Sequence, residues 1–381
     1  MKALVLGYGN IGSVIVADLI RSAPSIEVTV VDKRIFRAEN SVFVGTRNLI
    51  WIQLNVSDYP KLAQTMKGFD VVIGALPGEI GSNAVKASIA AKVNMVDVSY
   101  MPQNPLEFDD KARKAGTTII PNCGVAPGLS NLLAGHAVAK LDRLENVHIL
   151  VGGLPEKPVP PLDYTLTWSV SGLVDEYTRK AKIVQDGKVV EAEALGGLEI
   201  IEFPEVGKLE AFYTDGLGTL IHTAKNVKSM WEKTLRYPGH VEKINLLKAL
   251  GFFDEKPVQL EDASISPRKL TIKLLEEKLR KPGSKDILLM KIEVNGTKRD
   301  SKTSYVYYLI DHYDEKHGIT AMARTTAYTA SIIAQLLSQK VIEGKGVIPP
   351  EKVATTREIF SKILNELEKR QIRITKSKET F

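Results

Sequence analysis

The sequence predicts an α/β protein: a doubly wound parallel sheet followed by a second, α+β domain whose sheet is mainly antiparallel or mixed. Three observations predict this architecture. Apolar runs of strand length alternate with helical patterns through about the first 120 residues. A glycine-rich turn directly follows the first apolar run. After residue 126 the apolar runs are instead joined by hairpin turns such as Asp186-Gly187 and Asn295-Gly296.

The first 32 residues organise the rest of the chain. Ala3–Leu6 is an apolar run that predicts a buried strand, and Gly7-Tyr8-Gly9-Asn10-Ile11-Gly12 follows it at once. Apolar residues then recur at helical spacing, and a second apolar run, Val28–Val31, ends in Asp32. This order of strand, glycine turn, helix, strand and acid is the context in which a GxGxxG motif signals a dinucleotide site of the Rossmann type.

Each part of the glycine turn has a physical role in such a site. Gly7 permits the tight turn, Gly9 lets the backbone approach a pyrophosphate, and Gly12 lets the helix pack close to the strand. The unpaired N–H groups at the start of the helix, where Asn10 and Ile11 lie, would face the phosphates. We therefore expect these five residues to bind the cofactor.

The residues after the second strand bear on the choice of cofactor. Asp32 lies twenty residues after Gly12 and would accept hydrogen bonds from the hydroxyls of the adenosine ribose. Lys33 and Arg34 could instead neutralise the 2′-phosphate of NADP. Because the Asp32 carboxylate would repel that phosphate, the sequence favours NAD, and NADP stays open as the alternative.

The first domain continues with the same alternation. A short helical segment is expected after Asp32. Further strands are expected at 49–54, 69–73, 94–98 and 117–120, and helices at 58–66, 82–91 and 106–115. This alternation implies parallel strands with right-handed crossovers, so we expect residues 1–125 to form a complete dinucleotide-binding domain.

Ligands of such sheets bind at the carboxyl ends of the strands. Besides the glycine turn and Asp32, these strand ends carry Asn55, Ala75, Leu76, Pro77, Asp97, Ser99, Cys123 and Gly124. We expect these residues to contact the cofactor, with the nicotinamide near the later strands.

The rest of the chain predicts a second domain at 126–315 and C-terminal helices at 316–381. In the second domain we expect strands at 182–190, 198–203, 287–294 and 304–310, and helices at 226–235, 241–250 and 269–281. A helix at 319–337 is rich in small residues, which favours close packing, and we expect it to return to the first domain. A last helix is expected at 355–370, with disordered residues after it.

The composition excludes several classes of protein. A hydrophobic fraction of 44% and a charged fraction of 25% are typical of a soluble globular protein. A single cysteine excludes an internal disulfide and fits a reducing cytoplasm. No apolar run is long enough to span a bilayer, and a core strand at the N-terminus leaves no room for a signal peptide.

The net charge of +6 does not predict nucleic-acid binding. Part of the excess lies in the basic tail at 369–378, which we interpret as a solvated end without the interleaved aromatic residues of a stacking surface. The six histidines are scattered without the spacing of a metal site, so no metal is expected.

Several strings along the chain together resemble the saccharopine dehydrogenase family, from Met1 to about Leu337. They are the glycine turn and the strings Val96-Asp97-Val98-Ser99-Tyr100, Cys123-Gly124-Val125-Ala126-Pro127-Gly128-Leu129-Ser130-Asn131, Thr234-Leu235-Arg236-Tyr237-Pro238-Gly239-His240 and Ala323-Arg324-Thr325-Thr326-Ala327. The resemblance implies a nicotinamide-dependent oxidoreductase acting at a carbon–nitrogen bond of an amino acid, commonly as a homodimer. It makes 126–315 the substrate-binding and dimerisation domain.

Within the family the chain is most similar to the members that oxidise the ε-carbon of L-lysine with NAD. The implied products are ammonia and a semialdehyde that cyclises to a piperideine carboxylate. Saccharopine reductases and carboxynorspermidine synthase-like reductases are the alternatives within the family. A non-catalytic NAD-binding sensor is the alternative outside the enzymes.

The resemblance also implies a set of substrate residues. Arg236 matches the arginine that binds the substrate carboxylate, although it could be a surface arginine. Thr325 and Thr326 match a position near that carboxylate, with helix capping as the alternative. Trp168 could wall the aliphatic stem or simply belong to the core, and Glu79 could accept the substrate ammonium group.

The general base is left open among three residues. Asp97 follows a strand near the expected nicotinamide, where its carboxylate could accept the ammonium proton or anchor the next loop. His240, and with less support His222, titrates in a useful range, although a structural role is the alternative. Cys123 is expected to offer only a backbone contact, because hydride transfer from an amine needs no thiol.

Overall fold

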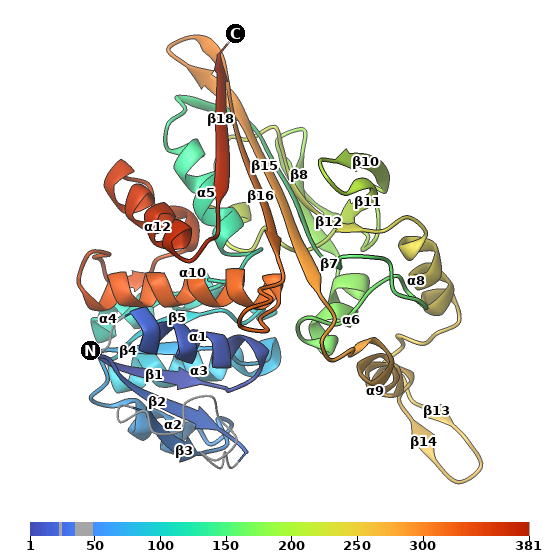
Figure 1. The fold of residues 1–381 in the computed structure, drawn as a ribbon, viewed down its shortest axis with the longest axis horizontal. Helices are drawn as coiled ribbons and strands as arrows, with labels where there is room; N and C mark the ends of the chain where they lie inside the picture. The colour runs from blue at the N-terminus through green and yellow to red at the C-terminus, as the bar shows by residue number, and fades with distance from the viewer. Residues whose placement is uncertain (23–24, 35–48, 381) are drawn as a thin grey trace. The chain divides into compact units, whose positions relative to one another are not determined.

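The computed structural model describes residues 1–22, 25–34 and 49–380 (Figure 1). The short helix expected after Asp32 falls outside these residues. The chain divides into two compact units, each described by itself: unit 1 comprises Met1–Lys140, Gly218–Ala224 and Ala323–Arg373, and unit 2 comprises Leu141–Leu217, Lys225–Met322 and Ile374–Phe381.

Unit 1 is built on a parallel sheet, and the doubly wound fold is confirmed. Among the described residues the sheet has seven strands in the order β17-β6-β5-β4-β1-β2-β3. Their bounds are β1 (Lys2–Leu6), β2 (Glu27–Asp32), β3 (Leu49–Gln53), β4 (Val71–Gly74), β5 (Asn94–Asp97), β6 (Thr118–Ile120) and β17 (Gly346–Val347). The strand order reverses between β1 and β4, which is where such sheets bind their ligands.

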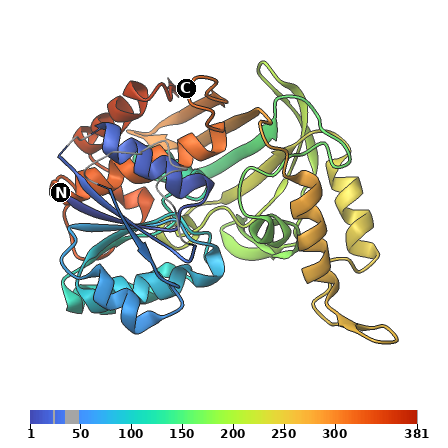
Figure 2. The same cartoon turned by 60° about the horizontal axis from the view of Figure 1, so that its bottom comes forward.

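Helices cover both faces of this sheet (Figure 2). They are α1 (Asn10–Ser22), α2 (Tyr59–Met66), α3 (Gly78–Ala91), α4 (Asp109–Ala115), α5 (Leu129–Val138), α7 (Leu220–Thr223), α10 (Ala321–Ser338), α11 (Pro350–Val353) and α12 (Arg357–Lys369), with a 3-10 turn at Pro105–Phe108. On one face, residues of α2 and α3 such as Leu62 and Val85 form a buried core with Leu4, Val72 and Met95 of the strands. Of α10, all but its first two residues belong to unit 1.

Local chemistry explains where these helices begin. The Asp58 side chain accepts a hydrogen bond from Lys61 N and caps α2. The helix expected at 82–91 begins four residues earlier, at Gly78. A Cβ at Gly78 would lie 2.2 Å from Tyr100 O, so glycine is what lets the first turn of α3 pack against that backbone.

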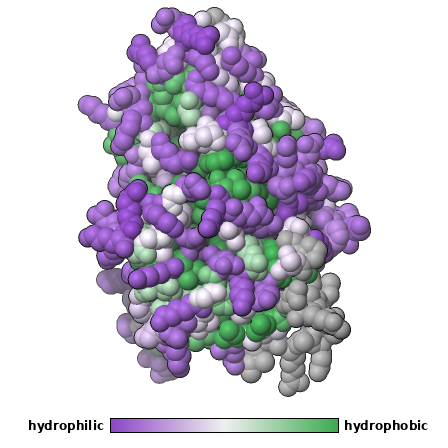
Figure 3. All heavy atoms as spheres, turned by 90° about the vertical axis from the view of Figure 1, so that its left-hand side faces the viewer, coloured by the Kyte–Doolittle hydropathy of each residue, from purple (hydrophilic) through white to green (hydrophobic). Residues whose placement is uncertain are grey.

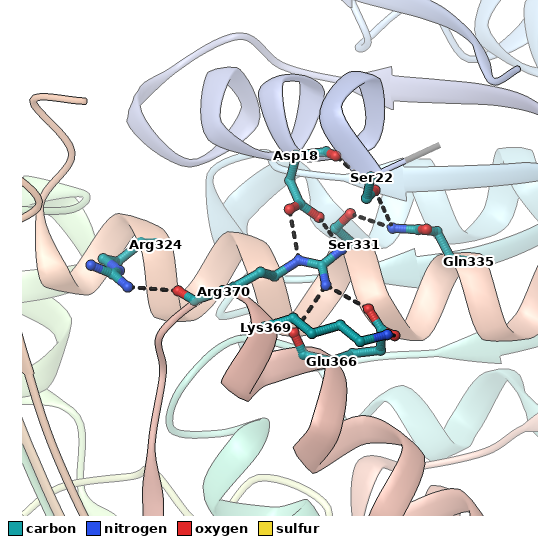
Figure 4. A network of polar contacts seen from close by, with 8 residues as sticks. All are labelled: Asp18, Ser22, Arg324, Ser331, Gln335, Glu366, Lys369 and Arg370. Atoms are coloured by element: carbon teal, nitrogen blue, oxygen red, sulfur yellow. Dashed lines mark hydrogen bonds and ion pairs between the residues drawn. The ribbon is translucent and has the colours of Figure 1, made fainter. Parts of the chain in front are cut away.

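One arginine ties α12 to α1 inside unit 1 (Figure 4). Arg370 donates from Nε and Nη2 to the two carboxylate oxygens of Asp18, at 2.7 and 3.0 Å. Its Nη1 donates to Glu366 Oε2 at 2.8 Å. Gln335 of α10 donates to Ser22 at the end of α1, at 3.0 Å. The Arg370–Asp18 pair is largely buried, and the network fastens two C-terminal helices to the helix that begins in the glycine turn.

Unit 2 is built on a mixed sheet, as expected. Its strands follow the order β10-β11-β12-β7-β15-β16-β18, with a β8–β9 hairpin joined to β12. The bounds are β7 (Arg143–Pro155), β8 (Ala181–Gln185), β9 (Lys188–Ala192), β10 (Glu199–Phe203), β11 (Gly207–Tyr213), β12 (Ser229–Arg236), β15 (Asp286–Lys298), β16 (Ser301–His312) and β18 (Ile374–Thr380). Strands β12 and β7 pair in parallel and the other pairs of this sheet are antiparallel.

The helices of unit 2 pack on a core of aromatic and aliphatic residues. They are α6 (Val170–Thr178), α8 (His240–Ala249) and α9 (Pro267–Leu279). Leu173 and Tyr177 of α6, Ile244 of α8 and Leu279 of α9 are fully or almost fully buried in one cluster with Phe212 of the sheet. A separate two-stranded hairpin, β13 (Val258–Gln259) and β14 (Ser264–Ile265), precedes α9.

Three expectations for unit 2 and its last strand are wrong. The stretch 226–235 is not a helix, because β12 occupies it from Ser229 and pairs there with β7 and β11. The turn expected at Asn295-Gly296 lies at Arg299 and Asp300, whose φ angles are 49° and 63°. Residues 374–380 are not disordered, because β18 pairs with β16 along seven residues.

The correction at Gly296 has a clear physical reason. A Cβ there would lie 2.1 Å from Arg143 O, so this glycine permits close approach of β7 and a register irregularity rather than a turn. At Asp186-Gly187, in contrast, the expected hairpin turn does join β8 to β9. The run expected as one strand at 182–190 is therefore two strands.

The surface of the described chain is mostly hydrophilic on the side drawn in Figure 3, with smaller hydrophobic groups between the polar ones. Among the described helices, none combines the length and the apolar character needed to cross a bilayer.

Candidate functional site

The glycine turn of unit 1 leaves room where a dinucleotide would approach. Gly7 has a φ of 90° and its N–H donates to Val31 O at 2.8 Å. A Cβ at Gly12 would lie 2.0 Å from Gly7 O, so the start of α1 packs directly on the turn. A Cβ at Gly9 would meet no atom of the other described residues within 4 Å. The turn is therefore closed on its protein side and open at Gly9, which fits a bound pyrophosphate.

Asp32 is held at the end of β2 by the same turn. Its Oδ2 accepts a hydrogen bond from Tyr8 N at 2.8 Å, and its Oδ1 accepts from Arg34 N and Nε at 2.9 and 3.1 Å. Burial acts to raise the pKa of Asp32, but the hydrogen bonds from Arg34 and Tyr8 outweigh it and lower the pKa. Asp32 is thus an ionised acceptor beside the glycine turn, with Arg34 as its counter-ion.

Three other expected cofactor residues, Ala75, Leu76 and Pro77, follow β4, where the strand order reverses. Ala75 N donates to Leu6 O at 2.9 Å, so the end of β4 lies beside the end of β1. Leu76 is partly exposed and Pro77 exposed at the start of α3. Asn55 and Lys33 are exposed, as is Glu79 in the first turn of α3.

A buried carboxyl group lies at the end of β5. Asp97 has no exposed surface, and its Oδ2 accepts hydrogen bonds from the N–H and hydroxyl of Ser99. Its Oδ1 has no hydrogen-bond partner in the described part of the chain and lies so close to Gly74 that a Cβ there would be 2.2 Å away. Burial raises the pKa of Asp97 to about 7 despite the bonds from Ser99.

Cys123 and Gly124 follow β6 beside this carboxyl group. Cys123 N donates to Asp97 O at 2.7 Å, and its thiol is buried. Burial, and then the charge of Asp97, raises the pKa of the Cys123 thiol, which keeps it protonated and a poor nucleophile. A Cβ at Gly124 would lie 3.6 Å from the methyl group of Thr326, so α10 reaches this strand end.

The two threonines of α10 do not cap it. The helix begins at Ala321, so Thr325 and Thr326 lie in its second turn. The cap is Asp286 of β15, whose carboxylate oxygens accept hydrogen bonds from Ala321 N and Met322 N at 2.6 and 3.0 Å. Sequence reasoning missed this cap because Asp286 lies 35 residues before the helix that it caps.

Arg236 ends β12 in unit 2 and is not a surface residue. It is 3% exposed, and its Nη2 donates to Glu176 Oε2 of α6 at 2.9 Å. Its guanidinium lies 4.6 Å from the ring centre of Tyr164. The Arg236 Nε group is buried and has no hydrogen-bond partner among the described residues. Arg236 is therefore an ion-paired buried cation whose Nε–H group has no partner among the described residues.

His240 is fully buried next to this arginine. Its Nδ1 lies 2.7 Å from Leu162 O, and because a carbonyl only accepts, Nδ1 carries the proton. Its Nε2, 2.9 Å from the Tyr177 hydroxyl, is then the acceptor. Burial, and then the charge of Arg236, lowers the pKa of His240 to about 3. Both ring nitrogens are thus occupied in a neutral imidazole.

The remaining candidates, Trp168 and His222, lie in different units. Trp168 is half-buried in unit 2, and its Nε1 donates to the Tyr164 hydroxyl at 3.1 Å. It packs so closely on Gly172 that a Cβ there would lie 2.5 Å from the indole ring. His222 is exposed in the short helix α7 of unit 1.

A hydrogen-bonded chain that the sequence reasoning missed extends from the Arg236 pair. Thr234 Oγ1 donates to Glu176 Oε1 at 2.7 Å and lies 2.8 Å from Thr214 Oγ1, which in turn contacts Glu232 Oε2. We call these four residues, Glu176, Thr234, Thr214 and Glu232, the hydroxyl chain. Its signal in the sequence is the spacing of Glu232, Thr234 and Arg236, which places all three on one face of a strand.

No metal centre accompanies these sites in the residues that the structure describes, where no three His, Cys, Asp or Glu side chains gather as ligands.

Known proteins resemble the chain along both units. The model of the saccharopine dehydrogenase NADP binding domain matches residues 3–120, and that of the saccharopine dehydrogenase C-terminal domain matches residues 124–372. The mitochondrial alpha-aminoadipic semialdehyde synthase of Bos taurus is 25% identical over 98% of this chain, which spans about half (47%) of that protein.

Two yeast proteins are similar as well. The L-glutamate-forming saccharopine dehydrogenase of Saccharomyces cerevisiae, whose name specifies NADP(+), is 26% identical over 79% of this chain and 69% of its own. A solved apo structure of the L-Glu-forming saccharopine dehydrogenase from the same yeast superposes with a TM-score of 0.77 at 21% identity, covering 99% of both chains. At that identity the superposition supports the fold.

Proposed function

The chain belongs to the saccharopine dehydrogenase family of NAD(P)-dependent oxidoreductases, and from this premise we propose that it oxidises a carbon–nitrogen bond of an amino acid. More specifically, we propose an L-lysine 6-dehydrogenase activity, in which the ε-carbon of L-lysine is oxidised with NAD. The products would be ammonia and the 6-semialdehyde, which cyclises to piperideine-6-carboxylate. The observation that carries the proposal is the open glycine turn beside an ionised Asp32 in a chain that matches the family in both units.

The cofactor would be held by the turn Gly7–Gly12, with the ribose on Asp32. When bound, NAD supplies the nicotinamide carbon that accepts a hydride. The lowered pKa of Asp32 supports NAD over NADP, because an ionised carboxylate repels a 2′-phosphate. Arg34 is already paired with Asp32, which leaves its charge less available to such a phosphate.

The proton of the ε-ammonium group must leave before hydride is transferred, and we propose Asp97 as the base. Its Oδ1 has no hydrogen-bond partner among the described residues and so keeps its lone pairs available. A pKa of about 7 matches a group that accepts a proton near neutral pH. His240 fits this role less well, because both of its ring nitrogens are engaged and its pKa is lowered to about 3.

The amino-acid end of the substrate would be bound by Arg236, whose Nε–H offers a donor to a carboxylate. The proposed supporting residues are Thr325 and Thr326 near the carboxylate, Trp168 along the aliphatic stem and Glu79 for an ammonium group. The protein is also proposed to act as a homodimer, which light scattering on the purified protein would test.

The proposal is tested by incubating the protein with NAD⁺ and separate amino acids while following the absorbance of NADH. We expect NADH with L-lysine and none with norleucine, which has the same chain length without the ε-amino group. Turnover of saccharopine in place of lysine would assign the sister activity, and NADPH consumption with a diamine and aspartate semialdehyde would assign a carboxynorspermidine synthase-like reductase. Binding of NAD without oxidation of any amine would indicate a sensor.

A further inference from the structure

The hydroxyl chain of unit 2 needs one more hydrogen than its two threonine hydroxyl groups provide. It has three oxygen–oxygen contacts: Glu176 to Thr234, Thr234 to Thr214, and Thr214 to Glu232. Each contact needs one hydrogen between its oxygens, and the two threonines bring only two. One of the two carboxyl groups must therefore carry a proton.

The surroundings decide which carboxyl group is protonated. Glu176 accepts a charge-assisted hydrogen bond from Arg236 at 2.9 Å, which favours its ionised form. Glu232 is 1% exposed and forms no ion pair within the described chain, whereas the carboxylates of Glu176 and Asp215 face it. Burial raises the pKa of Glu232 to about 8, and only Arg236 and the Thr214 hydroxyl act in the other direction. Asp215 is itself paired with Arg179 at 3.7 Å.

With the proton on Glu232, every hydrogen in the chain has one donor and one acceptor. The Glu232 carboxyl group donates to Thr214, which donates to Thr234, which donates to Glu176. All four side chains are more than nine-tenths buried, so water does not readily replace a missing partner. The chain ends on the carboxylate that pairs with Arg236.

We propose that Glu232 is a positioning residue for Arg236. Its neutral carboxyl group begins the hydroxyl chain and so holds Glu176 in a fixed orientation against the guanidinium group. Glu176 then accepts a hydrogen bond from Arg236 Nη2, and the Nε–H of Arg236 stays available to a carboxylate ligand. This role rests on the proposed function, in which Arg236 binds the carboxylate of the amino acid. The protonation of Glu232 does not depend on it.

Infrared difference spectroscopy tests the protonation without any substrate. At pH 7 we expect the carbonyl stretch of a protonated carboxyl group in the wild-type protein and its loss in Glu232→Gln. Comparing the two spectra isolates Glu232 from other carboxyl groups such as Asp97. Glu202→Gln, which alters an exposed glutamate of β10, is the matched control and should keep the band. A band of equal strength in wild type and Glu232→Gln would overturn the proposal.

Steady-state kinetics test the positioning role. Glu232→Ala and Thr214→Val remove a link of the chain, and we expect each to raise KM for the amino acid by about tenfold while leaving the affinity for NAD unchanged. Glu232→Gln should stay near wild type because its amide N–H donates in place of the carboxyl group. Wild-type KM should rise above about pH 8, where Glu232 ionises, and this rise should be absent in Glu232→Gln.

The outcomes separate the two proposals. A Glu232→Gln protein with the KM of Glu232→Ala, or a Thr214→Val protein with wild-type KM, would contradict the positioning role. If no amino acid is oxidised, the proposed function fails and the positioning role falls with it. The infrared result then still decides whether Glu232 carries the proton.

Discussion

The cofactor turn of unit 1 and the Arg236 cluster of unit 2 accommodate charged groups in opposite ways, the first in the open and the second in a buried ion pair. The turn is assembled from residues 7–32, and its key position, Gly9, faces open space. The cluster consists of Arg236 and the hydroxyl chain, whose residues lie in α6, in β12 and, for Thr214, directly after β11. Its Arg236–Glu176 pair spans 60 residues of sequence with almost no exposure. The first site thus depends on empty space beside exposed backbone, whereas the second depends on every buried charge having its partner. A substitution at the open position of the turn should therefore affect mainly ligand binding, whereas loss of a charge partner in the cluster should affect mainly folding stability.

The largest effect is expected from removing a charge partner in unit 2. Glu176→Ala leaves Arg236 buried without its carboxylate, and we expect the free energy of unfolding to fall by about 3–5 kcal/mol. Urea denaturation measures this change. Glu277→Ala, which breaks the exposed pair with Lys273, is the control and should cost at most about 1 kcal/mol. Equal losses in the two variants would mean that burial does not distinguish these ion pairs.

The next effect concerns the buried carboxyl group of unit 1. The pKa of Asp97 is raised to about 7, so the folded protein binds more protons than the unfolded chain between about pH 4 and pH 7. Wild-type stability should therefore fall relative to Asp97→Asn as the pH rises through that window, by about 2–4 kcal/mol in total, and then level off. Denaturation of both proteins at several pH values tests this, and a constant difference between them would contradict it.

A smaller loss of stability is expected at the crowded side of the glycine turn. The Cβ of Gly12→Ala would lie 2.0 Å from Gly7 O, a backbone atom that cannot rotate away. We expect a loss of about 1–3 kcal/mol, as for other overpacked sites, together with weaker NAD binding. A wild-type melting temperature in this variant would show that the turn is looser than its geometry indicates.

The smallest effect on folding, and the sharpest on binding, is expected at Gly9. Its added Cβ would meet no atom in the described part of the chain, so Gly9→Ala should keep the wild-type melting temperature. The methyl group would instead occupy the space of the pyrophosphate, and we expect the Kd for NAD to rise about tenfold or more. Titration of NAD by protein fluorescence measures it, and unchanged affinity would remove Gly9 from the proposed cofactor site.

The contrast between the two regions also explains what could be predicted from the sequence. The doubly wound sheet and the glycine turn are local patterns, in which a strand, a turn and a helix follow one another within 32 residues. Arg236, in contrast, was identified only through resemblance, and the strand that carries it was mistaken for a helix. Glu232, Thr234 and Arg236 are polar residues on the buried face of that strand, which hides the usual alternation of apolar and polar positions.

Long-range pairing accounts for the other misses. The two residues of β17 become a strand only beside β6, more than 220 positions earlier in the chain. The basic residues of β18 look solvated in the sequence, and they are exposed, yet their backbone pairs with β16. The protonation of Glu232 also depends on long-range partners, because Glu176 lies in α6 and Thr214 follows β11, and no local pattern reveals these contacts.

The central claim is that this protein takes hydride from the ε-carbon of L-lysine onto NAD, and isotopic labelling tests it most directly. The protein is incubated with NAD⁺ and L-lysine deuterated at the ε-carbon, and the reduced cofactor is analysed by mass spectrometry. The account predicts one deuterium in each molecule of NADH formed. NADH without deuterium, or deuterium that appears only when the α-carbon is labelled, would contradict it.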